Sequence, residues 1–237
     1  MSDRLPPAFY AHPGGPLRDL LAILHPPYTA WHLSYVVIGS AFAPEIEWLR
    51  LVGILAAFFL GLGVAAHALD EWNGRPLGTQ LPDRVLLALA IAGFGGALVV
   101  AGFGTLVISI WVLPWAIAGV VLAAAYAVEW PRPLHTDLGF AVAWGAFPVL
   151  VGYWSQTESL NGAAVLGALA ATALSLAQRK LSTPARYVRR AAPSARVEFA
   201  GEDVWGRERL LASWELPLKL LTGAVVLFAG SLLLRHI

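Results

Sequence analysis

Long apolar segments separated by short polar connections run along most of the chain. The seven segments lie at residues 26–43, 48–69, 84–101, 105–128, 138–154, 160–178 and 210–234. Roughly 20 apolar residues are enough for a helix to span a bilayer, and no Asp, Glu, Lys or Arg occurs from Val85 to Val128. The pattern predicts an all-α, polytopic transmembrane bundle of about seven spans, within a range of about six to nine. The range reflects the glycine-dense stretch Gly93–Gly104, which blurs one boundary.

Composition supports the same fold class. Hydrophobic residues make up 58% of the chain and charged residues 13%, whereas an ordinary soluble domain carries about 25% charged residues. We therefore expect residues 1–237 to form a single transmembrane domain. The absence of cysteine excludes disulfides and thiolate metal sites, and a net charge of +1 provides no general attraction to nucleic acid.

The basic residues indicate an orientation. With the N-terminus in the cytoplasm, most of the 16 Lys and Arg residues fall on one side of the membrane, as the positive-inside rule requires. Residues 1–24 are then a cytoplasmic arm and residues 179–209 a basic cytoplasmic loop. We expect an integral protein of a prokaryotic inner membrane, with its site on the cytoplasmic face.

The second segment ends in a polar cluster. His67, Asp70 and Glu71 are spaced i, i+3 and i+4, which predicts one shared helix face. An imidazole and two carboxylates in this arrangement suit a hard divalent cation or proton transfer. The alternative is a polar helix end in solvent, although His67 lies about a turn deeper and needs a partner there.

Two further cytoplasmic stretches carry candidate side chains. Tyr126 ends the fourth segment and Arg132 follows it in a proline-rich loop, where ordinary positive-inside topology is the alternative role. The sixth segment leads into the most basic stretch, which contains Gln178, Arg179, Lys180 and Arg186. Arginines there suit a phosphate clamp or attraction to anionic lipid head groups. In the last segment, the spacing of Glu215 and Lys219 predicts an ion pair.

Several motifs together resemble the UbiA superfamily of intramembrane prenyltransferases. They are His25-Pro26-Pro27, the polar cluster followed by Arg75-Pro76-Leu77, the tyrosine-proline loop from Tyr126 to Pro133, and Trp144-Gly145…Pro148…Gly152-Tyr153. The resemblance implies a helical bundle with a lateral pocket open to lipid. It also implies Mg²⁺ held by two Asp-rich motifs and an isoprenoid diphosphate as prenyl donor.

By this resemblance, Asp70 and Glu71 would hold Mg²⁺ and His67 would orient them. Substrate-binding roles would fall to Arg75, Arg132, Gln178, Arg179, Lys180 and Arg186, while the ring of Tyr126 would stabilise an allylic cation. The second motif would lie near Leu176–Arg190, a stretch without any carboxylate. Its basic residues are able to replace the charge of the missing metal.

Two hypotheses follow. The first is a divergent prenyltransferase that acts on an isoprenoid diphosphate and a lipophilic acceptor at the cytoplasmic membrane face. The second is a non-catalytic membrane subunit or module that binds a lipid or quinone-like molecule in the same pocket, with room for a protein partner. A transporter is less favoured, because no inverted repeat is detected.

Overall fold

The structure, a computed structural model, describes residues 5–12, 14–198 and 204–237. Residues 1–4 and 13 of the expected arm and residues 199–203 of the expected basic loop lie outside this range. The α-helices are α1 (Pro16–Ile23), α2 (Pro26–Ala41), α3 (Trp48–Phe58), α4 (His67–Gly74), α5 (Asp83–Val107), α6 (Val112–Ala127), α7 (Asp137–Ala141), α8 (Phe147–Thr157), α9 (Gly162–Ala191) and α10 (Arg207–Leu233). The other elements are the π-helical segments η1 (Phe59–Ala66) and η3 (Val142–Ala146), the 3₁₀ turns η2 (Arg132–His135) and η4 (Leu234–His236), and the antiparallel pair β1 (Arg196–Glu198) and β2 (Val204–Gly206).

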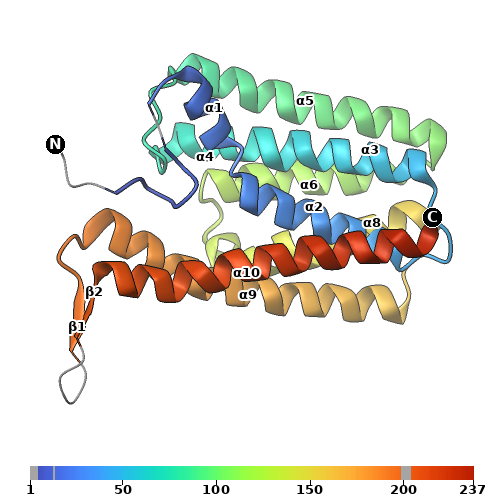
Figure 1. Cartoon of the computed structure of the whole chain (residues 1–237). Helices are drawn as coiled ribbons and strands as arrows, with labels where there is room; N and C mark the ends of the chain where they lie inside the picture. Colours follow the sequence, from blue (N-terminus) through green and yellow to red (C-terminus); the bar gives the residue numbers. More distant parts are fainter. Residues whose placement is uncertain (1–4, 13, 199–203) are drawn as a thin grey trace.

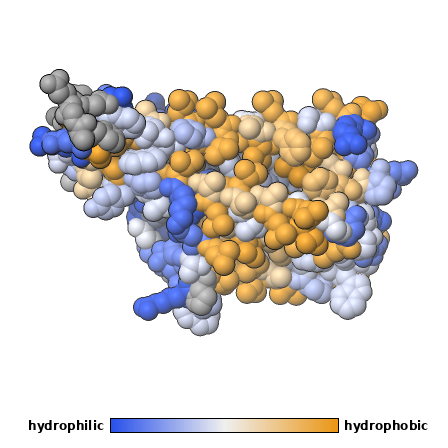
Figure 2. All heavy atoms as spheres, turned by 90° about the horizontal axis from the view of Figure 1, so that it is seen from below, coloured by the Kyte–Doolittle hydropathy of each residue, from blue (hydrophilic) through white to orange (hydrophobic). Residues whose placement is uncertain are grey.

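The long helices lie side by side in one bundle, with the β hairpin at one end and the C-terminus at the other (Figure 1). Among the described residues, five helices are long and apolar enough to cross a membrane: Trp48–Gly74, Asp83–Val107, Asp137–Thr157, Gly162–Ala191 and Arg207–His236. The apolar helix α6 is shorter. Hydrophobic atoms cover much of the middle of the face in Figure 2, and hydrophilic atoms gather toward its ends. The all-α membrane bundle is therefore confirmed as a fold class.

Two expected boundaries are wrong. Helix α5 continues through the whole glycine-dense stretch to Val107, so the break between the third and fourth segments lies at residues 108–111. Helix α9 continues to Ala191, so residues 179–191 are helical and not a loop. The buried positions Ser182, Ala185 and Val188 keep the helical spacing of α9 in this region. Ala185 and Val188 pack in one cluster with Leu211 of α10, and this contact stabilises the extension.

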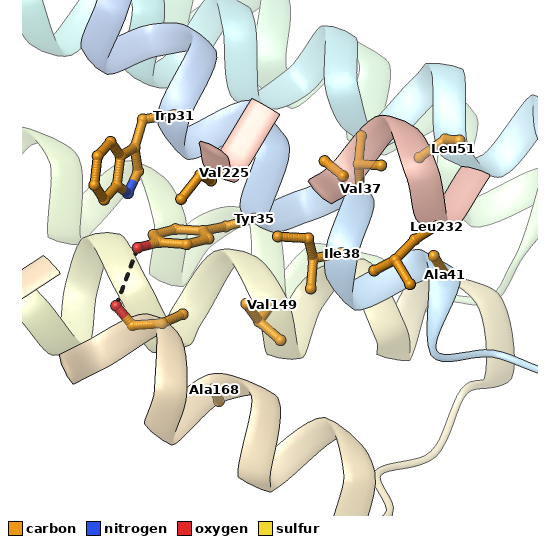
Figure 3. Packing of buried hydrophobic residues seen from close by; sticks show 12 residues of the cluster. Trp31, Tyr35, Val37, Ile38, Ala41, Leu51, Val149, Ala168, Val225 and Leu232 are labelled. Carbon is orange, nitrogen blue, oxygen red and sulfur yellow. Dashed lines mark hydrogen bonds between the residues drawn. The ribbon is translucent and has the colours of Figure 1, made fainter. Parts of the chain in front are cut away.

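The core is organised around α2, which lies against α8, α9 and α10. Trp31, Tyr35 and Val149 are almost fully buried there and pack in one cluster (Figure 3). The Tyr35 hydroxyl donates a hydrogen bond to the backbone oxygen of Ala171 on α9, at 3.2 Å. A buried phenol requires such a partner, and this one connects α2 to α9.

Helices α2 and α8 approach until their backbones touch. A Cβ atom added to Gly39 would lie 2.1 Å from the Val149 carbonyl oxygen, and one added to Gly152 would lie 2.3 Å from the Val36 carbonyl oxygen. The Ser40 hydroxyl donates to the Gly152 carbonyl oxygen at 3.1 Å. Small residues allow this kind of close packing between membrane helices.

A buried ion pair joins α9 to α10, but it differs from the expected one. Arg189 donates two hydrogen bonds to the carboxylate of Glu215, one of them at 2.8 Å. Its third nitrogen donates to the Pro6 carbonyl oxygen at 3.3 Å, which attaches the N-terminal arm to α9. The predicted pairing of Glu215 with Lys219 is wrong. The Lys219 ammonium lies 4.8 Å from the centre of the Phe9 ring.

The close contact of α2 with α8 predicts the effect of adding one methyl group. Gly152→Ala should lower the free energy of unfolding by at least about 1–3 kcal/mol, because the backbones must separate to admit the Cβ atom. The matched control is Gly53→Ala, since a Cβ atom there meets nothing within 4 Å. Thermal unfolding of the detergent-purified variants measures both effects. A Gly152→Ala protein as stable as the Gly53→Ala protein would contradict the assigned contact.

Candidate functional site

A polar pocket of about 300 Å³ lies at the end of the bundle that contains the start of α2, the end of α6 and the last turns of α9. It is enclosed by α2, α4, α6, α9, the π-helical segments and the N-terminal arm. Six of the ten site residues expected from the sequence line it: His67, Asp70, Tyr126, Gln178, Arg179 and Arg186. Residues more than a hundred positions apart therefore meet in one cavity, as expected for a binding site.

Glu71 does not share this pocket. Its side chain is fully buried, and one carboxylate oxygen accepts hydrogen bonds from the Thr79 amide at 2.8 Å and the Thr79 hydroxyl at 2.9 Å. The other oxygen accepts from the Leu77 amide at 2.8 Å. Glu71 therefore stabilises the loop after α4, and its expected shared face with Asp70 is wrong.

Three basic candidates also lie outside the pocket. Arg75 donates to the carbonyl oxygens of Thr79 and Leu81 and pairs with Asp83, so it also stabilises the loop after α4. Lys180 is largely exposed and pairs with Asp137 at 2.6 Å. Arg132 lies exposed on η2.

The donor set does not fit a Mg²⁺ ion held by Asp70 and Glu71. Mg²⁺ requires several oxygen ligands in octahedral geometry, and both Glu71 oxygens already accept protein hydrogen bonds. Within the described residues, no group of three His, Cys, Asp or Glu side chains is placed to hold a metal ion. Of the two expected carboxylate ligands, only Asp70 therefore faces the pocket.

The pocket contains residues that the site prediction omitted, above all Tyr10 of the N-terminal arm and His25. The Tyr10 hydroxyl lies 2.6 Å from His25 Nδ1. Burial, followed by the charges of His67, Arg186 and Arg190, lowers the pKa of His25 well below its usual value, while burial raises the pKa of Tyr10. Tyr10 therefore keeps its proton and shares a hydrogen bond with a neutral imidazole. The His-Pro-Pro motif was the one sequence signal for His25, and nothing marked Tyr10.

Three arginines on α9 line the pocket, and they differ in their partners. Arg179 contacts Asp137 at 3.2 Å and donates to the Tyr126 hydroxyl at 2.9 Å. Arg186 and Arg190 have no carboxylate within ion-pair distance among the described residues. Two cations on one pocket wall without an acid partner provide a binding surface for an anion.

A second cavity, almost entirely apolar, adjoins the polar pocket. It measures about 180 Å³ and is walled by α3, α5, α6 and α8 with parts of both π-helical segments. Leu62 and Trp144 line both cavities. The two compartments therefore meet at these side chains, which come from η1 and η3 respectively.

Two histidines form hydrogen bonds with backbone carbonyl groups of the two π-helical segments. Such wide turns alter the regular backbone pairing and often occur at functional sites. His32 Nδ1 lies 2.9 Å from the Trp144 carbonyl oxygen, and His67 Nδ1 lies 3.2 Å from the Gly63 carbonyl oxygen. A carbonyl only accepts, so both Nδ1 atoms carry the proton. The His67 ring also lies 4.3 Å from the His25 ring, between centres.

The different environments of the two neighbouring acids predict different mutant phenotypes. Glu71→Ala should lower the free energy of unfolding by about 1.5–3 kcal/mol, because buried donors lose a charged acceptor. Asp70→Asn, the control, should leave stability near that of the wild type. Thermal unfolding with and without Mg²⁺ measures this. The assignment fails if Mg²⁺ stabilises the wild type and Glu71→Ala removes that stabilisation without weakening the metal-free protein.

Comparison of the chain with protein-family models, curated proteins and solved structures finds no match.

Proposed function

We propose that this protein binds an isoprenoid diphosphate, with the anionic head in the polar pocket and the chain in the apolar cavity. The observation that carries the proposal is the contact of the two compartments at Leu62 and Trp144. Two cavities that share the side chains of Leu62 and Trp144, one lined by cations and the other apolar, match the two parts of such an amphiphile. The basic residues favour the cytoplasmic face for this head group.

The head group would bind to α9. Arg186 and Arg190 are four residues apart, so they lie on the same helix face, and both line the pocket. Planar guanidinium groups match phosphate oxygens in pairs. Arg179, already oriented by Asp137 and Tyr126, would add a third positive charge near the junction of the cavities.

The isoprenoid chain would extend along α3. The cavity is lined from Leu49 at one end of this helix to Leu62 in η1, which corresponds to about 20 Å at a helical rise of 1.5 Å per residue. Lipid tails are as apolar as these walls. The walls therefore contact and orient the isoprenoid chain but do not distinguish it from a lipid tail. Selectivity against ordinary lipids comes from recognition of the diphosphate head group.

The binding proposal predicts that the unpaired arginines recognise the diphosphate. Replacing both Arg186 and Arg190 by Gln should weaken binding of an isoprenoid diphosphate by about a hundredfold or more, since each charge-assisted contact contributes about 1.5–3 kcal/mol. The control is Arg132→Gln, an exposed arginine outside the pocket. Ligand-dependent thermal stabilisation of the purified protein gives the affinities. Equal binding by the double variant and the control would contradict the proposal.

Prenyl transfer is a second candidate function, favoured by the aromatic rings at the junction. The Tyr126 ring centre lies 5.7 Å from those of Phe140 and Trp144. In a transfer, the C1–O bond of the donor breaks and its electron pair leaves with the diphosphate. The acceptor supplies the new electron pair to C1 and releases a proton to solvent. Ring faces stabilise the allylic cation, and arginines stabilise the leaving group.

Transfer and binding are separable by a turnover assay. If the α9 arginines stabilise the leaving group in place of a metal ion, diphosphate release from a labelled donor should persist in EDTA. Tyr126→Leu should slow it by about tenfold or more, because a cation–π contact at a desolvated site contributes about 2 kcal/mol. Tyr126→Phe keeps the ring and should retain most activity. Tight binding without any diphosphate release would remove the transferase and leave a non-catalytic lipid-binding module.

A further inference from the structure

The wall of the polar pocket contains a buried amide oxygen without a partner among the described residues. Gln178 lines the pocket and is 3% exposed, and its Oε1 atom has no hydrogen-bond partner among the described residues. Buried side-chain oxygens are almost always satisfied, because leaving one unpaired is costly. An orphaned acceptor in the wall of a ligand-sized cavity indicates a group that is supplied by the ligand.

The position of Gln178 on α9 separates it from Arg186 and Arg190. Gln178, Ser182, Arg186 and Arg190 follow one another at four-residue intervals and all line the pocket. Along this face of the helix, an amide and a hydroxyl are followed by two guanidinium groups. Gln178 is about 18 Å from Arg190 along the helix axis. This row of residues therefore changes from neutral hydrogen-bonding groups to the positive charges of Arg186 and Arg190. Arg179, which follows Gln178, is paired with Asp137.

The neutral end of this wall lies beside the junction with the apolar cavity. Gly145 of η3 packs directly on α9, where an added Cβ would be 2.6 Å from the Ala171 carbonyl oxygen and 2.8 Å from Ser175 Oγ. Gln178 follows Ser175 by about one helical turn, and Trp144 precedes Gly145. Both Gln178 and Trp144 line the polar pocket.

The acceptor character of Oε1 selects the ligand chemistry. Phosphate oxygens accept hydrogen bonds and cannot satisfy another acceptor, so a diphosphate head leaves Oε1 unpaired. A hydroxyl group has a proton to donate. It would reach Oε1 while the attached chain enters the apolar cavity past Trp144.

We infer that Gln178 forms a second subsite, which recognises the hydroxyl of an isoprenoid alcohol through a hydrogen bond to Oε1. The inference rests on the proposed function, which places the isoprenoid chain in the apolar cavity. It adds a neutral ligand, the alcohol, and a residue that selects this ligand. The alcohol and the diphosphate would share the chain cavity but use different ends of the α9 wall.

The test compares an isoprenoid alcohol, its methyl ether and its diphosphate, all with the same chain. Thermal stabilisation as a function of ligand concentration gives apparent dissociation constants for each. The wild type should bind the alcohol about tenfold more tightly than the ether, the usual effect of satisfying one buried acceptor. Gln178→Leu should remove this preference and leave diphosphate affinity unchanged.

Thr172→Val is the matched control on the same helix. The Thr172 hydroxyl donates to the Ala168 carbonyl oxygen of its own helix, so its loss should leave the preference intact. An alcohol preference that survives Gln178→Leu overturns the subsite, as does failure of the wild type to bind the alcohol. So does a loss of diphosphate affinity alone in Gln178→Leu, because Gln178 would then be a donor to the anion.

The proposed function and the subsite fail in different ways. A wild type that prefers the alcohol through Gln178 but does not bind the diphosphate retains the subsite and loses the proposed head-group site. Binding of the diphosphate without any preference between alcohol and ether retains the proposed head-group site and removes the subsite.

Discussion

The backbone contact between α2 and α8 determines where the other parts of the bundle lie. Glycines at positions 39 and 152 allow each helix to meet a carbonyl group of the other, and Ser40 adds a hydrogen bond across the contact. This places His32 of α2 beside the Trp144 carbonyl. One wall of the polar pocket and the aromatic side chain at the cavity junction are thus positioned by a single helix pair.

The two π-helical segments give this packing its functional shape. Each widens a long helix at the depth where the polar and apolar compartments meet, and each directs one side chain, Leu62 or Trp144, toward both cavities. The backbone oxygens of Gly63 and Trp144 are contacted by His67 and His32. His32 and His67 therefore serve as hydrogen-bond partners of the backbone. This role accounts for imidazoles beside arginines in the pocket.

Many of the helices were predictable because the length of an apolar segment is a local property of the sequence. The basic residues of α9 were identified from the sequence, but their shared helix face was not, because residues 179–191 were expected to form a loop. The end of α5 was not predictable, because a glycine-dense stretch usually indicates a helix boundary. In the bundle, Gly93 instead lets α5 approach η1, where a Cβ would lie 2.7 Å from the Leu60 carbonyl oxygen.

The site was less predictable wherever a role depends on a distant segment. Helical spacing placed Asp70 and Glu71 together, but the loop at residues 77–79 binds the Glu71 carboxylate and turns it into a structural group. Tyr10 reaches the pocket because Arg189 holds the carbonyl of Pro6, a contact across most of the chain length. Local pattern contains no information about either event.

The burial of α2 has a consequence for how membrane proteins are recognised from hydropathy. A helix of 16 residues, about 24 Å long, that is surrounded by other helices meets protein instead of lipid. It can therefore carry threonine, histidine, serine and tyrosine along its length, as Thr29, His32, Ser34 and Tyr35 do. Among the described residues, a criterion of length and hydropathy for a spanning helix therefore does not select α2, although α2 lies at the centre of the bundle.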